Sequence, residues 1–203
     1  KNLSSINFHD NVTTISSYAF SECTNLTTIN IPDNVEIIEP YAFSGSSLLT
    51  IDIPEGTTNI SDHLFYSCKN LCSINFHDNV TTISSYAFSG CSNLTSMTLP
   101  KYVSSILPYA FSGSSIITIE IPEGITSISD NMFYKSKNLS TIKFHEKITT
   151  IGSYAFYQCT NLSSIKIPDT INSIGAYAFS VSGLISIEIP EKTLSISHHM
   201  FQL

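Results

Sequence analysis

The sequence predicts a solenoid in which short parallel strands stack along one axis, and three observations lead to this prediction. Variants of one pattern, L-x-x-I-x-[IF]-[PH]-x-x-V-x-x-I-x-x-[YHN]-[AML]-F, return nine times at steps of 22 or 23 residues. These copies group into three similar blocks, residues 1–68, 69–136 and 137–203. Within each copy, apolar and polar residues alternate over a short stretch. A period in the twenties is typical of solenoids, in which each coil contacts only its neighbours. We therefore expect about nine coils over residues 1–203, forming one solenoid that is a piece of a longer chain.

Each copy predicts the same elements in the same order. In residues 26–32, Ile29 and Ile31 lie two positions apart and point inward, which predicts a short strand that Pro32 ends. Residues 12–15 form a second short extended segment, and residues 18–20 read as a helical or 3-10 turn before the chain returns to the next Leu. We expect the first strands to form a parallel sheet on the concave face. The second extended segments and the turns then lie on the convex side.

The core of such a solenoid has to come from stacking. Each coil contributes one Phe and about four aliphatic side chains, and burial of a Phe-sized side chain is worth about 1.5–3 kcal/mol. One coil alone exposes its apolar edges above and below, so stability requires neighbours. Because the chain starts and stops within the pattern, we also expect uncapped terminal coils that associate end to end or fray.

Composition excludes several classes of function. All nine basic residues are Lys, Arg is absent, and the net charge is −7 with a pI near 5.2. Nucleic-acid recognition depends on clustered positive charge and on Arg, so we expect no nucleic-acid partner. No apolar run is long enough to cross a bilayer, so we expect no membrane insertion within this segment. The first block holds the net negative charge.

The repeated residues resemble the BspA-like leucine-rich repeat family, whose consensus runs L-x-x-I-x-I-P-x-x-V-x-x-I-x-x-x-A-F-x-x-C-x-x-L. This resemblance covers the whole chain and implies a right-handed leucine-rich-repeat solenoid. For many members it also implies display on mucosal bacteria or protist parasites and adhesion to host proteins or other cells. The chain departs from the general repeat at the Asn position after the first strand, which holds Asn11, Asn34 and Asn79 but elsewhere other residues, including Tyr102.

Two columns of side chains are candidate binding surfaces. The first is the exposed side of the predicted concave sheet, a hydroxyl column beside a mixed polar column, from which the candidates are Thr28, Asn30, Thr50, Asp52, Ser73, Asn75, Thr118, Glu120, Lys143, Lys166 and Glu188. The second is an aromatic column of Tyr18, Tyr41, Tyr86, Tyr109, Tyr154 and Tyr177. Aromatic residues supply more contact energy than small polar ones if they are exposed. The hydroxyl columns could instead only solvate the sheet, and the phenols could cap loop carbonyls.

Acidic residues occupy the position after the Pro/His position in eight of nine coils, and Lys101 is the exception. A turn that favours Asp explains most of this column, and weak binding of a cation or basic partner is the alternative. His9, His77 and His145 stand three coils apart, roughly 14 Å at the usual strand spacing, too far to share one metal ion. We therefore expect no metal site.

Four of the five Cys lie three residues after the Phe position, where a small buried side chain is the simplest interpretation. Cys68 and Cys91 fall in neighbouring coils, which leaves a disulfide open as a hypothesis. Eight N-x-[ST] sequons occur. Most arise because the repeat itself places Asn two residues before Ser or Thr, so their number does not decide whether they are glycosylated.

No arrangement of catalytic residues is present, and we expect neither an enzyme nor a cofactor. Our leading hypothesis is a non-enzymatic binding or adhesion module, at the cell surface or secreted, that engages a protein or glycan on a host or neighbouring cell through many weak contacts. The alternative is a structural spacer, or a cytoplasmic scaffold. Ice binding by the Thr and Ser columns is disfavoured because charged residues interrupt the second, mixed polar column and because the sheet should curve.

Overall fold

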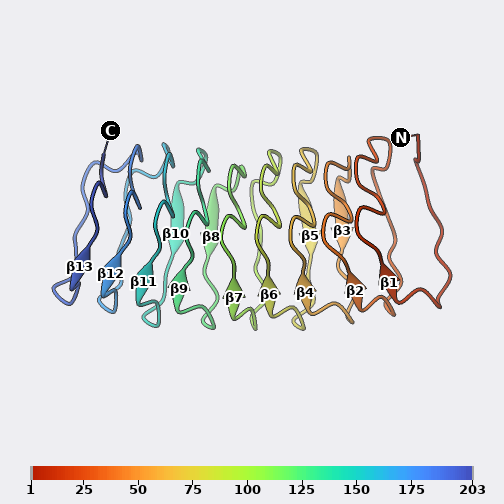
Figure 1. The fold of residues 1–203 in the computed structure, drawn as a ribbon, viewed down its shortest axis with the longest axis horizontal. Helices are drawn as coiled ribbons and strands as arrows, with labels where there is room; N and C mark the ends of the chain where they lie inside the picture. The colour runs from red at the N-terminus through yellow and green to blue at the C-terminus, as the bar shows by residue number, and fades with distance from the viewer. Residues whose placement is uncertain (1, 203) are drawn as a thin grey trace.

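The computed structural model describes residues 2–202. The chain winds into a parallel β-solenoid whose coils follow one another from the N- to the C-terminus (Figure 1). This confirms the predicted solenoid. It has about eight turns rather than the nine we expected. The pattern returns nine times, but the intervals between nine successive Leu positions make only eight complete turns.

The more extensive of two rows of short strands is the one that carries the second extended segment of each repeat. We call it the nine-strand row, and within residues 2–202 it consists of β1 (Thr14–Ile15), β2 (Ile37–Ile38), β4 (Asn59–Ile60), β6 (Thr82–Ile83), β7 (Ser105–Ile106), β9 (Ser127–Ile128), β11 (Thr150–Ile151), β12 (Ser173–Ile174) and β13 (Ser195–Ile196). All pairs are parallel, in three groups: β1-β2, β4-β6-β7 and β9-β11-β12-β13.

The predicted first strand forms a ladder in only part of the solenoid. The four-strand row consists of β3 (Thr50–Asp52), β5 (Ser73–Asn75), β8 (Thr118–Glu120) and β10 (Thr141–Lys143), paired as β3–β5 and β8–β10. Each pair joins the last coil of one block to the first coil of the next. The Pro that ends most of these segments lacks an N–H group, which leaves a three-residue strand few donors for a longer ladder.

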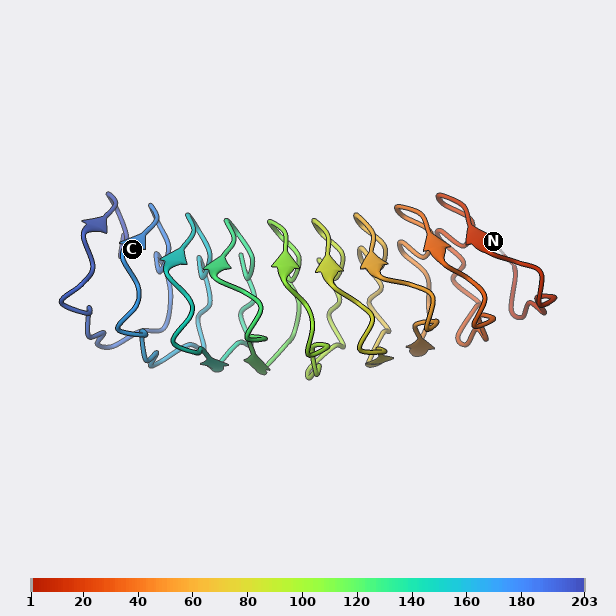
Figure 2. The ribbon, with the colours of Figure 1, turned by 90° about the horizontal axis from the view of Figure 1, so that it is seen from below.

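The two rows lie on opposite sides of the solenoid. Figure 2 shows a shallow arc in which the nine-strand row lies on the inner side. The four-strand row, which we expected on the concave face, lies on the outer side of this arc.

Our prediction of a helical or 3-10 turn is wrong, because neither kind of helix occurs in residues 2–202. Instead, N–H groups alternate between bonds within a coil and bonds to the next coil: Ala19 donates to Ser16, whereas Phe20 donates to Ala42 in the next coil. The physical reason is the backbone, because Tyr18 (φ 60°) and Glu22 (φ 56°) are left-handed and interrupt any helix. The equivalent positions are left-handed in the following coils as well, up to Val181 and His199.

The core is a column of Phe rings beside columns of Leu and Ile. Successive rings stack nearly parallel from Phe20 to Phe201, as in the pair Phe88 and Phe111 (5.7 Å between centroids, 6° between planes). Rings from Phe43 to Phe179 are almost completely buried. The last coil differs, since Ile185 and Leu194 are 90% and 89% exposed.

Candidate functional site

A hollow of about 990 Å³ lies on the four-strand row, across three consecutive coils in the middle of the chain. Its floor contains the half-buried Met97 and the buried Ile119. Polar and aromatic groups line its sides and rim: Thr98, Lys101, Tyr102, Thr118, Glu120, Glu123, Thr141, Lys143 and Lys147. All nine of these residues are exposed to solvent, and some of them contact one another.

The hollow lies where the repeat changes its residues. In some other coils the position equivalent to Tyr102 is an asparagine, as at Asn34 and Asn79. Each of these two side-chain amides donates to a backbone carbonyl of the preceding coil, over 2.8 and 2.9 Å respectively. A tyrosine side chain cannot make this short link, and Tyr102 is 58% exposed. In the next coil Gly124 packs so closely that a Cβ atom there would lie 2.6 Å from the carbonyl oxygen of Val103. This close packing leaves no room for a side chain at Gly124, which lines the hollow together with Tyr102.

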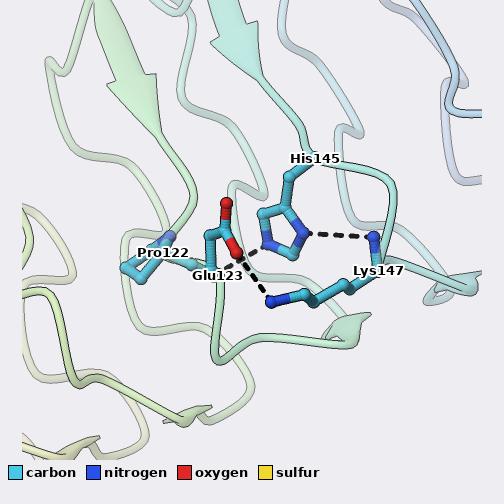
Figure 3. A network of polar contacts seen from close by, with 4 residues as sticks. All are labelled: Pro122, Glu123, His145 and Lys147. Carbon is cyan, nitrogen blue, oxygen red and sulfur yellow. Dashed lines mark hydrogen bonds and ion pairs between the residues drawn. The ribbon is translucent and has the colours of Figure 1, made fainter.

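One wall of the hollow is an ordered polar network (Figure 3). Lys147 Nζ donates to Glu123 Oε2 over 2.6 Å, and this ammonium group lowers the pKa of the Glu123 carboxyl. The backbone N–H of Lys147 donates to His145 Nδ1 over 3.2 Å, so this ring nitrogen accepts. His145 therefore carries its proton on Nε2, which donates to the carbonyl of Pro122 over 2.8 Å. The network orients the His145 ring and fixes Lys147 and Glu123 at the rim.

Two of the three Lys side chains in the hollow form ion pairs with Glu, and the third does not. Lys143 Nζ lies 3.4 Å from Glu120 Oε2 in the adjacent strand. Lys101 forms no ion pair within residues 2–202; its ammonium group lies 5.1 Å from the centroid of the Tyr102 ring. Because the hollow contains three Lys and two Glu, it has one net positive charge on a chain whose net charge is −7.

All eleven predicted residues of the sheet face are exposed. The strand register brings three pairs of them together: Thr50 with Ser73, Asp52 with Asn75, and Glu120 with Lys143. Thr118 is paired with Thr141, which was not among the predicted residues. The Asn75 amide donates to Asp52 Oδ1 over 2.5 Å. Thr28, Asn30, Lys166 and Glu188 lie in coils without a ladder on this side. None of the four lines the hollow, although Lys166 lies in the coil that directly follows it.

The predicted tyrosine column is a ladder of stacked rings. Tyr18, Tyr41, His63, Tyr86 and Tyr109 stack with centroids 4.3–4.8 Å apart and planes within 15°. A second stack contains Tyr154, Tyr177 and His199. Ring faces within each stack contact one another, so mainly ring edges remain for a partner. No Tyr hydroxyl in residues 2–202 donates to a loop carbonyl, so the interpretation as carbonyl caps is not supported.

Asn131 separates the two stacks, and a neighbouring tyrosine fills in. Asn131 occupies the aromatic position with the same left-handed backbone (φ 58°), which Asn tolerates well. Tyr134 lies edge-on to Tyr109 and Tyr154, with centroid distances of 6.2 and 6.5 Å. One block earlier, Tyr66 lies tilted against His63 at 5.5 Å, but there the His63 ring itself keeps the stack continuous. These substitutions preserve aromatic packing along the edge.

All five Cys are free, including Cys68 and Cys91. The Cys68 thiol donates to the carbonyl of Phe43 over 3.0 Å, and Cys91 donates in the same way to Phe65 over 3.1 Å. Ser136 makes the equivalent bond to Phe111 over 2.8 Å, which explains why Ser replaces Cys there. Burial raises the pKa of Cys68 to about 11. These bonds link neighbouring coils, and burial keeps the Cys68 thiol protonated.

No group of three or more His, Cys, Asp or Glu side chains in residues 2–202 is placed to hold a metal ion. His9, His77 and His145 lie in separate coils, and His77 Nδ1 lies 3.7 Å from Glu55 Oε1 of the preceding coil. No helix that could span a bilayer is found in the described part of the chain.

Sequence reasoning selected Thr118, Glu120 and Lys143 of the hollow. It missed six other lining residues: Thr98, Lys101, Tyr102, Glu123, Thr141 and Lys147. Two signals were available. Lys101 is the one residue that is not acidic in the acidic column, and Tyr102 is the one aromatic residue at the Asn position. Their adjacency marks the place where the surface stops repeating.

A family model described as "BspA type Leucine rich repeat region" matches the chain in six copies, over residues 1–117 and 81–203. No curated protein sequence matches the chain significantly. Among solved structures, the chain is similar to a leucine-rich repeat protein from Bacteroides ovatus (24% identity, TM-score 0.53), with 97% of this chain and 69% of that one covered.

Two further structures are similar at TM-score 0.61. The pneumococcal vaccine antigen PcpA is 19% identical, and the match covers 98% of this chain and 68% of that one. A leucine-rich repeat protein from T. pallidum is 20% identical, with 84% and 70% covered. At these identities, the similarities show the fold alone.

Proposed function

Because the chain belongs to the BspA-type leucine-rich repeat family, we propose that it is a non-enzymatic binding module that engages a partner through the hollow on its four-strand row. The partner is a protein or glycan on a host or neighbouring cell. Adhesion is the proposed role, and the cell surface or the secreted fraction is the proposed location. Self-association through the terminal coils stays a prediction.

One observation carries this proposal: Lys101 and Tyr102 interrupt two repeated columns at the same point, beside an open hollow. Binding sites are concave and combine apolar surface with a few polar groups. Interface hot spots favour exposed aromatic side chains that can be buried on binding. The repeated Ser and Thr columns offer many equivalent weak contacts, whereas the hollow offers a distinct one. We therefore place specificity in the hollow and avidity in the columns.

The chemistry of the hollow supports binding over catalysis. Its charged groups are Lys and Glu side chains on the surface, two pairs of which neutralise each other. General acid–base or nucleophilic catalysis needs a group that is poised by burial or by an activating neighbour. The buried thiols are protonated and lie in the core, away from the hollow.

A surface location is supported by the family resemblance, and one protein of similar fold is a pneumococcal vaccine antigen. The test is adhesion of beads coated with residues 1–203 to cultured epithelial cells. We expect adhesion that falls when Lys101→Glu and Tyr102→Ala are introduced together. Adhesion equal to that of uncoated beads would reject the adhesive role for this segment.

A second candidate, a structural spacer, is favoured by the unbroken Phe stack from Phe20 to Phe201. Such a column stiffens a solenoid without contacting any partner. A spacer tolerates change on its surface. Adhesion that is unaffected by any substitution in the hollow, in a longer protein that requires the segment, would favour this role.

A further inference from the structure

Resting on the proposed function, we propose that the hollow binds a glycan carrying a carboxylate, such as one that ends in a sialic or uronic acid residue. The inference depends on three features of the hollow: an ammonium group without a carboxylate partner, one exposed aromatic ring, and surrounding hydroxyl and carboxylate groups. Each matches a different part of an acidic sugar.

Lys101 supplies the anion contact. Lys143 and Lys147 are each engaged by a Glu of the adjacent coil, at 3.4 and 2.6 Å. Lys101 is held over the Tyr102 ring instead and keeps its hydrogen-bond donors available. The net negative charge of the chain lies in its first block, away from the hollow, and the hollow itself has one net positive charge, so an anionic ligand is attracted there. Charge complementarity therefore selects a ligand with a localised negative group.

Tyr102 supplies the apolar contact. It is the one large apolar side chain lining the hollow that is exposed, at 58%; Leu99, Ile119 and Ile121 in the floor are buried. Tyrosine presents a flat apolar body with a polar tip. A pyranose ring, which has a face of C–H groups, can cover such a surface, whereas a peptide with several apolar side chains would find only one exposed apolar partner here.

The remaining groups suit sugar hydroxyls. Exposed hydroxyls of Thr98, Thr118 and Thr141 donate and accept, and the carboxylates of Glu120 and Glu123 accept only. A polyhydroxylated ligand provides donors to the Glu oxygens and partners to the Thr hydroxyls. This arrangement favours an acidic sugar over a peptide carboxylate, which brings few hydroxyl groups.

Ligand-observed NMR titrations of residues 1–203 test the assignment with 3′-sialyllactose, a glucuronic-acid-terminated disaccharide, lactose and a tetraglutamate peptide. We expect at least one acidic sugar to bind at least tenfold more tightly than lactose. Lys101→Glu should raise its Kd at least tenfold. Lys137→Glu, which makes the same charge change on an exposed turn outside the hollow, should leave the Kd unchanged. Tyr102→Ala should weaken binding of all the sugars, and matched circular dichroism and melting curves verify folding.

Equal affinity for lactose and both acidic sugars, or equal Kd values for Lys101→Glu and Lys137→Glu, would overturn the acidic-glycan assignment. Binding of tetraglutamate through Lys101 without binding of the sugars would also overturn it, while leaving the proposed binding role of the hollow intact. Adhesion to epithelial cells that is unchanged by both Lys101→Glu and Tyr102→Ala would instead reject the proposed function. The two failures are therefore distinguishable.

Discussion

The imidazole of His63 lies face to face with the phenol ring of Tyr41, with 4.3 Å between centroids and 14° between planes. Its other face covers Tyr86 at 4.6 Å, and its Nδ1 atom is buried without a hydrogen-bond partner. One titratable ring thus occupies the middle of an aromatic ladder.

This position predicts a pH-dependent stability. Burial lowers the pKa of His63 below its ordinary value of 6.5, opposed in part by the Asp62 carboxylate. The unfolded chain therefore binds more protons than the folded chain below pH 6.5, so the stabilisation is present above this pH and is lost as pH falls through the folded pKa. In His63→Tyr, we expect a smaller decrease in Tm between pH 7 and pH 5 than in the parent. Equal decreases in thermal melts of both proteins would contradict this assignment.

The linking bond of Ser136 predicts a contrast between two substitutions. Ser136→Cys restores the residue used in four other coils and keeps a donor for the Phe111 carbonyl, so stability should stay close to that of the parent. Ser136→Ala removes the bond and should cost about 0.5–1.5 kcal/mol. Urea denaturation monitored by circular dichroism measures the difference. A Ser136→Ala midpoint equal to that of Ser136→Cys would show that the bond contributes nothing.

Thiol reactivity should divide the five Cys. Burial raises the pKa of Cys68 to about 11 and that of Cys159 to about 12, so little reactive thiolate is present at pH 8. Exposed Cys72 should be alkylated by iodoacetamide first, and the buried Cys only after unfolding. Mass spectrometry of unreduced, denatured protein should find five alkylated sites. A Cys68–Cys91 disulfide in that material would contradict the free thiols.

The Phe column predicts that the effect of truncation depends on burial. Phe111 stacks between Phe88 and Phe133 and is fully buried, so Phe111→Ala should cost about 3–5 kcal/mol. Phe201 is 45% exposed and stacks on one side with Phe179, so Phe201→Ala is the matched control with a smaller loss. Comparable losses in chemical denaturation would mean that stacking in the middle of the column is not the main source of stability.

Periodicity predicted the solenoid and its core because those residues repeat with the coil: Ile29, Ile31 and the Phe positions point inward wherever they occur. It did not predict the turn at Tyr18, since a left-handed φ at a tyrosine has no signature in hydrophobic pattern. Nor did it predict how far each strand row would extend, because ladder formation depends on register between coils. Six of the nine polar and aromatic residues that line the hollow were not predicted, because the hollow depends on the departures at Lys101 and Tyr102, and a repeat pattern averages departures away.

The most direct test of the central claim, that specificity resides in the hollow, is a four-variant comparison of bead adhesion to epithelial cells. Lys101→Glu and Tyr102→Ala change the hollow, while Lys137→Glu and Tyr66→Ala make the same chemical changes on exposed residues elsewhere. We predict that each hollow variant loses at least tenfold in the bead concentration needed for half-maximal adhesion, and that the controls match the parent. Equal adhesion by all four variants, with unchanged melting curves, would contradict the account.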